Sequence, residues 1–174
     1  MPTLIQRRMA AALEGEFVVF LIGMRVNRPW KVHKWLPIAL AMRRMLRDLT
    51  TRPESGLLGF QVYRGGRNRL VVQYWRSFEH LERFAHDPAR DHVPAWLDFN
   101  RSVGSSGDVG IWHETYRVAA GQYEAIYHNM PPHGLGAVGP LVPASGRHAT
   151  AAGRLGLRER DDAPIDPAGA IHRS

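Results

Sequence analysis

The stretch from Phe17 to Val26 constrains the fold of this chain more than any other part of its sequence. It reads FVVFLIGMRV, a run of aromatic, β-branched and other aliphatic residues in which apolar and polar positions do not alternate. Such a composition is typical of a strand that is covered on both faces of its sheet. The run therefore predicts the central strand of a sheet that needs cover on each side.

A helix and a hairpin are predicted after this strand. From Trp35 to Leu49, apolar residues recur with the 3.6-residue period of an amphipathic helix, while arginines fall on the opposite side. Residues 57–63 and 69–75 are two strand-like runs, separated by a loop whose glycines permit the positive φ angles of a hairpin turn. We expect these two strands to pair antiparallel.

Further helical segments and a last strand complete the pattern. Ser77 is a suitable N-cap for a second helix, another helical segment is expected over about 89–103, and residues 109–118 alternate as a strand. The order β-α-β-β-α-β is the ferredoxin-like pattern of the α+β class. Its single sheet leaves one face exposed unless two copies pack sheet to sheet. The sequence therefore predicts a homodimer of the dimeric α/β-barrel type, with residues 119–133 reaching across the partner.

Composition divides the chain near residue 133. All sixteen aromatic residues lie in 1–133, whereas 134–174 contain seven glycines and four prolines. A segment without aromatic side chains buries little surface to offset its ordering entropy. We therefore expect one ferredoxin-like domain, 1–133, and a flexible, largely disordered tail rich in Gly, Pro, Ala and Arg, 134–174.

Composition also excludes several classes of function. The chain has no cysteine, which excludes disulfides, thiolate nucleophiles and cysteine-ligated metal sites. The net charge of +7 attracts anions, but the basic residues are scattered among acidic ones, so no nucleic-acid partner is expected. The longest apolar run, Phe17 to Met24, is far shorter than the roughly 20 residues that cross a bilayer. We expect a cytoplasmic protein with no membrane partner.

Several segments resemble one known superfamily, the dimeric α/β-barrel monooxygenases, which includes antibiotic-biosynthesis monooxygenases and haem-degrading enzymes. The stretch VVQYWRSFEHLERF, residues 71–84, is similar to a strand-to-helix junction of that superfamily. Four motifs together resemble the fumagillin-pathway monooxygenase-like family within it: Gly-Met-Arg at 23–25, Gln-Tyr-Trp-Arg-Ser at 73–77, Gly-Ile-Trp-His-Glu-Thr-Tyr at 110–116 and Tyr-His-Asn-Met-Pro at 127–131. The resemblance covers about residues 15–136.

This resemblance implies oxygenation of a bulky hydrophobic small molecule, in a pocket between the sheet and the helices of each subunit. In the haem-degrading branch, a tryptophan at the end of the third strand lies beside the cofactor, and a histidine on the next helical segment binds the iron. Trp75 and His92 fall at approximately those positions. The branch also uses an asparagine in its first strand, where this chain is apolar through Gly23. The cofactor is therefore either none or haem, with His92 as the candidate iron ligand.

His92, Trp96 and Asn100 are spaced four residues apart, so on a helix they share one face. If that face lines the pocket, neutral His92 ligates haem iron or acts as a general base. Trp96 would then contact the substrate and Asn100 would position a polar group. In the alternative interpretation Trp96 is an ordinary core residue and His92 is exposed in the first turn of the helix.

His113 is the second candidate base. It shares a strand face with Ile111 and Thr115, whereas Glu114 points to the opposite face and cannot act with it as a direct pair. An imidazole that faces the pocket would remove a proton from the substrate. The alternative is a buried, hydrogen-bonded core histidine. For Glu114 we expect an ion pair with Arg25 or with a helix arginine.

Arg25, Trp112 and Tyr116 are the remaining candidates for substrate binding. The guanidinium of Arg25 offers a planar fork of donors to an anionic group or a haem propionate, or else it lies in water at the strand end. Trp112 would shape the cavity and Tyr116 would donate a hydrogen bond to the substrate. Alternatively, the aromatic residues of this region pack in the dimer interface.

These residues lead to three hypotheses. The first is a small oxygenase of a hydrophobic metabolite, cofactor-free or haem-assisted, in which a pocket histidine is the base or the iron ligand. The second is a haem-dependent enzyme of the dehydratase type. The third belongs to another class, a non-catalytic dimeric ligand-binding protein. Fold analogy does not separate them, because one fold hosts many reactions.

Overall fold

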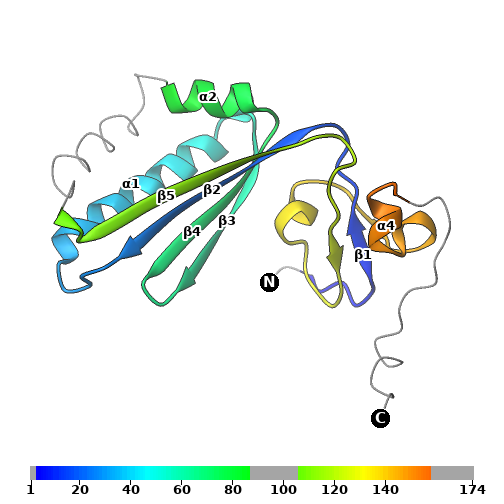
Figure 1. The fold of residues 1–174 in the computed structure, drawn as a ribbon, viewed down its shortest axis with the longest axis horizontal. Helices are drawn as coiled ribbons and strands as arrows, with labels where there is room; N and C mark the ends of the chain where they lie inside the picture. Colours follow the sequence, from blue (N-terminus) through cyan, green and yellow to red (C-terminus); the bar gives the residue numbers. More distant parts are fainter. Residues whose placement is uncertain (1–2, 87–105, 158–174) are drawn as a thin grey trace, which may run out of the picture. The chain divides into compact units, whose positions relative to one another are not determined.

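The computed structural model describes residues 3–86 and 106–157, and the chain divides into two compact units (Figure 1). Residues 16–118 form one unit, which we call the ferredoxin-like unit. Residues 1–15 and 119–174 form the other, which we call the terminal unit.

In the ferredoxin-like unit, the four predicted strands and the first two predicted helices follow one another in the predicted order. Its elements are β2 (Phe17–Val26), α1 (Val32–Thr50), the short 3-10 helix η1 (Pro53–Ser55), β3 (Leu57–Gly65), β4 (Asn68–Trp75), α2 (Phe78–His86) and β5 (Val109–Val118). The strands lie in the order β3-β4-β2-β5 with antiparallel neighbours, and the β3–β4 hairpin turns at Gly66, whose φ is 53°. The helical segment expected at 89–103 lies outside the described residues. The ferredoxin-like fold is thus confirmed.

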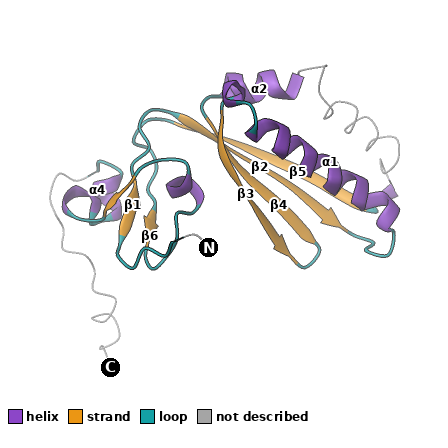
Figure 2. Ribbon diagram, turned by 180° about the vertical axis from the view of Figure 1, so that it is seen from behind, coloured by secondary structure: helices purple, strands orange, loops and turns teal. Residues whose placement is uncertain are grey.

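Helices α1 and α2 lie on the same face of the sheet, which we call the helix side (Figure 2). Two clusters of buried residues form the core there. The first consists of Val18, Leu49, Trp75, Leu81 and Phe84, and the second of Met24, Val26 and Val109. Among the described helices, none has the length and apolar character that crossing a membrane requires.

Within this unit the other face of the sheet carries neither α1 nor α2, and we call it the open face. Gly23 alternates with the core residue Met24, and its cross-strand partner Trp112 therefore points to the open face. The indole of Trp112 lies on Gly23, where an added Cβ would come within 2.3 Å of the ring. Trp112 and Tyr116 are 40% and 51% exposed on this face. Within this unit the open face is the uncovered sheet face that the sequence predicted. Helices α1 and α2 cover the sheet, including β2, on the helix side.

The terminal unit is built around a second, three-stranded sheet. Its elements are β1 (Met9–Ala11), β6 (Ile126–Tyr127), η3 (Gly134–Ala137), β7 (Leu141–Pro143), η4 (Gly146–His148) and α4 (Ala151–Arg154). Strand β1 is the middle strand and pairs antiparallel with β6 and β7. Met9, Ala10 and Ala11 are all buried. The N-terminal segment thus pairs with segments more than a hundred residues away.

The prediction of a flexible tail from Gly134 is therefore wrong for residues 134–157, which fold as part of the terminal unit. The predicted domain 1–133 is also divided differently, because 1–15 and 119–133 belong to the terminal unit. Residues 158–174 lie outside the described residues. Within residues 119–133, which were expected to reach across a partner, strand β6 (Ile126–Tyr127) pairs with β1 of the same chain.

The composition argument failed because the aromatic cover of this segment comes from elsewhere in the chain. The backbone N–H of Gly136 donates a hydrogen bond to the hydroxyl of Tyr127, at 2.9 Å. A Cβ at Gly136 would come within 2.8 Å of Leu141 and 2.9 Å of the Tyr127 ring. The glycine that indicated disorder is thus required here by close packing.

Candidate functional site

Trp75 and His113 are the two predicted site residues that the structure places on the helix side of the sheet. Trp75 is fully buried at the end of β4, and its ring packs against Phe84 with a centroid distance of 5.5 Å. Its indole Nε1–H donates a hydrogen bond of 2.8 Å to Oε1 of Gln73. Trp75 is therefore a core residue whose polar atom orients the side chain of Gln73.

Gln73 is a candidate that the sequence analysis missed. It is 1% exposed and stands directly opposite Phe20 of β2. Its Nε2 is buried and has no hydrogen-bond partner in the described part of the chain. The sequence held a signal, because Gln73 is a polar residue placed between Val71 and Trp75 on one strand face. Buried polar groups are normally paired, so an unpaired amide in the core calls for an explanation.

The imidazole of His113 lies on the same side of the sheet and is exposed. His113 stands opposite Ile22 of β2, and its ring packs on Phe20 with a centroid distance of 5.8 Å and a tilt of 43°. It is therefore not a buried core histidine. Phe20 lies between Gln73 on β4 and the ring of His113 on β5, so the amide and the imidazole flank one apolar side chain.

Arg25, Trp112 and Tyr116 lie on the opposite, open face. The guanidinium of Arg25 donates from Nε to Oδ1 of Asn27 at 3.2 Å and from Nη1 to Oδ1 of Asn68 at 3.3 Å. These amide oxygens hold the guanidinium at the end of the strand. The structure therefore separates the predicted residues into two groups, one on each face of the sheet.

Glu114 shares the open face with Tyr116 and accepts a hydrogen bond from its hydroxyl. This hydrogen bond, together with the negative charge of the carboxylate, raises the pKa of the Tyr116 phenol. The structure thus shows Glu114 hydrogen-bonded to Tyr116, whereas the sequence analysis predicted an ion pair between Glu114 and an arginine.

Three predicted residues, His92, Trp96 and Asn100, lie outside the described residues. Their roles, including His92 as iron ligand, stay predictions. Within 3–86 and 106–157, no group of three His, Asp or Glu side chains is placed to hold a metal ion.

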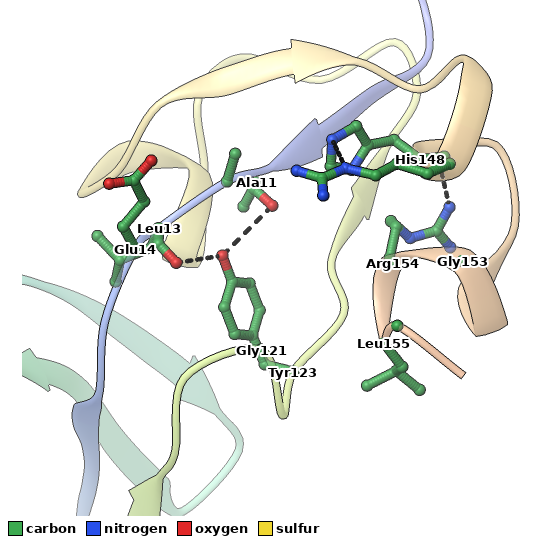
Figure 3. A pocket seen from close by; sticks show the side chains of 12 residues that line it. Ala11, Leu13, Glu14, Gly121, Tyr123, His148, Gly153, Arg154 and Leu155 are labelled. Carbon is green, nitrogen blue, oxygen red and sulfur yellow. Dashed lines mark hydrogen bonds between the residues drawn. The ribbon is translucent and has the colours of Figure 1, made fainter. Parts of the chain in front are cut away.

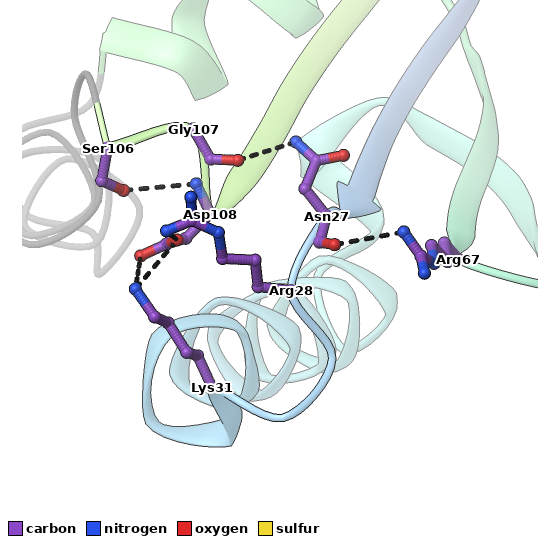
Figure 4. Close-up of polar contacts among 7 residues, drawn as sticks. All are labelled: Asn27, Arg28, Lys31, Arg67, Ser106, Gly107 and Asp108. Carbon is purple, nitrogen blue, oxygen red and sulfur yellow. Dashed lines mark hydrogen bonds and ion pairs between the residues drawn. The ribbon is translucent and has the colours of Figure 1, made fainter.

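Asp108, which is buried and directly precedes β5, forms an ionic cluster with two partly exposed cationic side chains (Figure 4). Its carboxylate accepts from Nη1 of Arg28 at 2.8 Å and from Nζ of Lys31 at 3.0 and 3.1 Å, and its backbone N–H donates to Ser106. The hydrogen bond from Lys31 is the main cause of a lowered Asp108 pKa, and the charges of Lys31 and Arg28 add to it. Because the carboxylate is fully paired, we interpret the cluster as a structural link between α1 and β5.

The terminal unit contains a cavity of about 280 Å³ (Figure 3). Arg154 lies at its wall with a side chain only 5% exposed, donating to Oε2 of Glu124 at 2.8 Å and to the carbonyl of His148 at 2.7 Å. The hydroxyl of Tyr123 donates to the carbonyl of Leu13 at 2.8 Å, and burial raises the pKa of this phenol. The ion pair with Glu124 compensates the charge of the Arg154 guanidinium at the wall of this cavity.

Solved structures with this fold include enzymes. The structure of an aldoxime dehydratase in complex with butyraldoxime matches with a TM-score of 0.59 and 18% identity, covering 89% of this chain and 44% of that one. A cofactor-independent oxygenase from Streptomyces nogalater matches with a TM-score of 0.42 and 12% identity, covering 58% of this chain and 91% of that one. At these identities the likeness shows the fold alone.

Sequence comparison shows the family. Monooxygenase af470 from Aspergillus fumigatus is 34% identical over 131 residues, which cover 71% of this chain and 46% of that protein. The chain thus spans about half the length of this relative. The family model described as Monooxygenase af470-like matches residues 17–135, which include the whole ferredoxin-like sheet. The chain therefore belongs to the Monooxygenase af470-like family.

Proposed function

We propose that this chain is an oxygenase of a hydrophobic small molecule and that the molecule binds on the helix side of the ferredoxin-like sheet. The observation that carries the proposal is the position of His113, an accessible imidazole against the apolar ring of Phe20. A base beside an apolar surface is the combination that proton removal from a hydrophobic substrate needs. Membership of a monooxygenase-like family supports the reaction class.

In the proposed reaction, neutral His113 removes a proton from a CH₂ group that an adjacent carbonyl makes acidic. The carbanion supplies electrons to O₂. One oxygen atom stays on the carbon as a new carbonyl, and the other leaves as water with the two hydrogen atoms of the CH₂ group. The substrate itself is the reductant, so the balance needs no further electron donor.

The open face supports a second part of the proposal, a homodimer. Trp112 and Tyr116 expose aromatic surface there, beside the partly buried side chains of Leu21 and Val72. A second copy packed sheet to sheet would remove this apolar surface from water.

A haem-dependent dehydratase is the alternative, and the observation that favours it is the aldoxime dehydratase fold shared over 89% of the chain. In this alternative a histidine would hold the iron. Among the described helix-side residues, His113 presents an accessible imidazole for that purpose, and His92 remains the predicted ligand.

Oxygen consumption tests the proposal. The probe is β-tetralone, an aromatic ketone with an acidic CH₂ group. We expect oxygen uptake by the wild type and a roughly 100-fold slower rate in His113→Gln, because the base is lost. His128→Gln, an exposed histidine of the terminal unit, is the matched control and should keep the rate.

Equal rates in wild type and His113→Gln would contradict the proposed base. Binding of β-tetralone without oxygen uptake would favour the non-catalytic ligand-binding protein. A Soret band after haem addition, lost in the His92→Ala or His113→Ala variant, would favour the haem alternative.

A further inference from the structure

We propose that the cavity of the terminal unit binds a small organic carboxylate, which the guanidinium groups of Arg147 and Arg154 hold. The cavity has a volume of about 280 Å³, just below the roughly 300–1,000 Å³ of pockets for drug-sized ligands, so its occupant is a small molecule. All of its lining residues belong to the terminal unit. The proposal therefore does not depend on the reaction proposed for the ferredoxin-like unit.

His148 holds both arginines at the wall of the cavity. Nη1 of Arg154 donates to the carbonyl oxygen of His148 at 2.7 Å, and Nε of Arg147 donates to Nε2 of the same histidine at 3.3 Å. Gly153, which precedes Arg154 in α4, packs so closely on this segment that an added Cβ would collide with the carbonyl oxygen of Arg147. The two guanidinium groups are thus anchored to one residue.

The charge of one of these two groups is compensated within the chain. The side chain of Arg154 is only 5% exposed, and its ion pair with Glu124 offsets the cost of burying a cation. Among the described residues, no carboxylate forms an ion pair with Arg147, which also lines the cavity. Two like charges held on one residue repel each other, so an anion bound between them is favoured.

The arginines also offer hydrogen-bond donors to such an anion. Nη2 of Arg154 and the two Nη nitrogens of Arg147 have no hydrogen-bond partner in the described part of the chain. The planar fork of a guanidinium matches the two oxygens of a carboxylate. Most of the remaining wall is apolar, so we expect the carboxylate to be attached to a small apolar group. The apolar surface comes from Ala11, Leu13, Leu155 and the ring of Tyr123.

The wall also carries an acidic side chain, Glu14, away from the buried arginine. Figure 3 shows Glu14 and Arg154 on opposite sides of Tyr123. The ligand carboxylate therefore lies on the arginine side of the cavity, and Glu14 repels it from a distance. This arrangement gives the proposal a test in both directions, because removing a cation should weaken binding and removing Glu14 should strengthen it.

Calorimetric titration of the whole chain compares benzoate with benzamide, a neutral molecule of nearly the same shape. We expect the wild type to bind benzoate at least tenfold more tightly, and Arg147→Gln to lose roughly tenfold in benzoate affinity, because a charge-assisted hydrogen bond is lost. Glu14→Gln should bind benzoate about two- to threefold more tightly. Arg7→Gln, the same charge change at an exposed residue of the terminal unit outside the cavity wall, is the matched control and should keep the wild-type affinity.

NMR on the wild type places the ligand without relying on any variant. The ring protons of bound benzoate should show nuclear Overhauser effects to the side chains of Tyr123 and Leu155, and the guanidinium signals of Arg154 should shift with benzoate but not with benzamide. Equal binding of the two molecules, no binding of benzoate, or the wild-type affinity in Arg147→Gln overturns the proposal. Tighter binding of inorganic phosphate than of benzoate would show that the carboxylate assignment is wrong.

Discussion

The indole of Trp75 and the amide of Gln73 form a hydrogen-bonded pair in the core, with 2.8 Å between Nε1 and Oε1 and with exposures of 0% and 1%. Through this hydrogen bond the core residue Trp75 orients the side chain of Gln73, whose Nε2 is a donor on the helix side of the sheet. The Trp75 ring also packs against Phe84, so the pair is part of the core between the sheet and α2.

Trp75→Phe should lower the free energy of unfolding by about 1–3 kcal/mol, because the smaller ring leaves a void and Oε1 of Gln73 loses its donor. Urea unfolding measures the change. Trp30→Phe is the matched control, since Trp30 is 71% exposed, and its effect should stay within about 0.5 kcal/mol. Equal losses in both variants would contradict the buried pair.

Asp108→Asn should destabilise the protein at neutral pH, and the difference from the wild type should shrink in acid. The Asp108 pKa is lowered in the folded state, chiefly by the hydrogen bond from Lys31. The unfolded state therefore binds a proton more readily. The carboxylate's stabilising contribution is fully present above the unfolded pKa, about 4, and is lost as the pH falls through the lower folded pKa.

Unfolding measured at a series of pH values checks this dependence. Asp48→Asn is the control, because its ion pair with Arg52 at 3.0 Å is solvent-exposed and contributes little. A stability difference for Asp108→Asn that did not change with pH would exclude the ionic explanation.

Trp112→Glu should weaken the proposed homodimer by roughly tenfold or more, because a carboxylate would replace apolar surface at the centre of the interface. Light scattering after gel filtration, over a range of concentrations, measures the association. Ile111→Glu is a close control, since Ile111 is 38% exposed, like Trp112 at 40%, but points to the helix side. A monomeric wild type, or equal weakening by both variants, would count against sheet-to-sheet packing.

Gly136→Ala should destabilise the terminal unit by about 1–3 kcal/mol, because the new methyl group would come within 2.8 Å of Leu141 and 2.9 Å of Tyr127. Limited proteolysis and thermal unfolding follow the loss. Gly65→Ala is the control, as no atom lies within 4 Å of its added Cβ. Rapid cleavage of wild-type residues 134–157 would show that this segment is not folded.

Local sequence determined the elements of the ferredoxin-like unit. The apolar run Phe17–Val26 is β2 from its first residue to its last, and the alternating segment Val109–Val118 is β5. Period and composition are properties of neighbouring residues, so they can be read without the fold. The same alternation correctly placed Glu114 on the strand face opposite to that of His113.

The terminal unit could not be read in this way. Its middle strand, Met9–Ala11, has three residues, and its partners begin at Ile126 and Leu141. So short a strand carries no periodic signal, and its stability comes from pairing with distant segments. Composition alone therefore indicated disorder where the chain folds.

Sequence by itself thus determined which segments of the ferredoxin-like unit become strands and which residues share a strand face, because both follow from the local pattern of neighbouring residues. Only the tertiary structure decided that β1 joins the last third of the chain, and that Trp75 binds the oxygen of Gln73 and so leaves the amide nitrogen unpaired among the described residues. Those outcomes depend on contacts between side chains and strands that the local pattern does not specify.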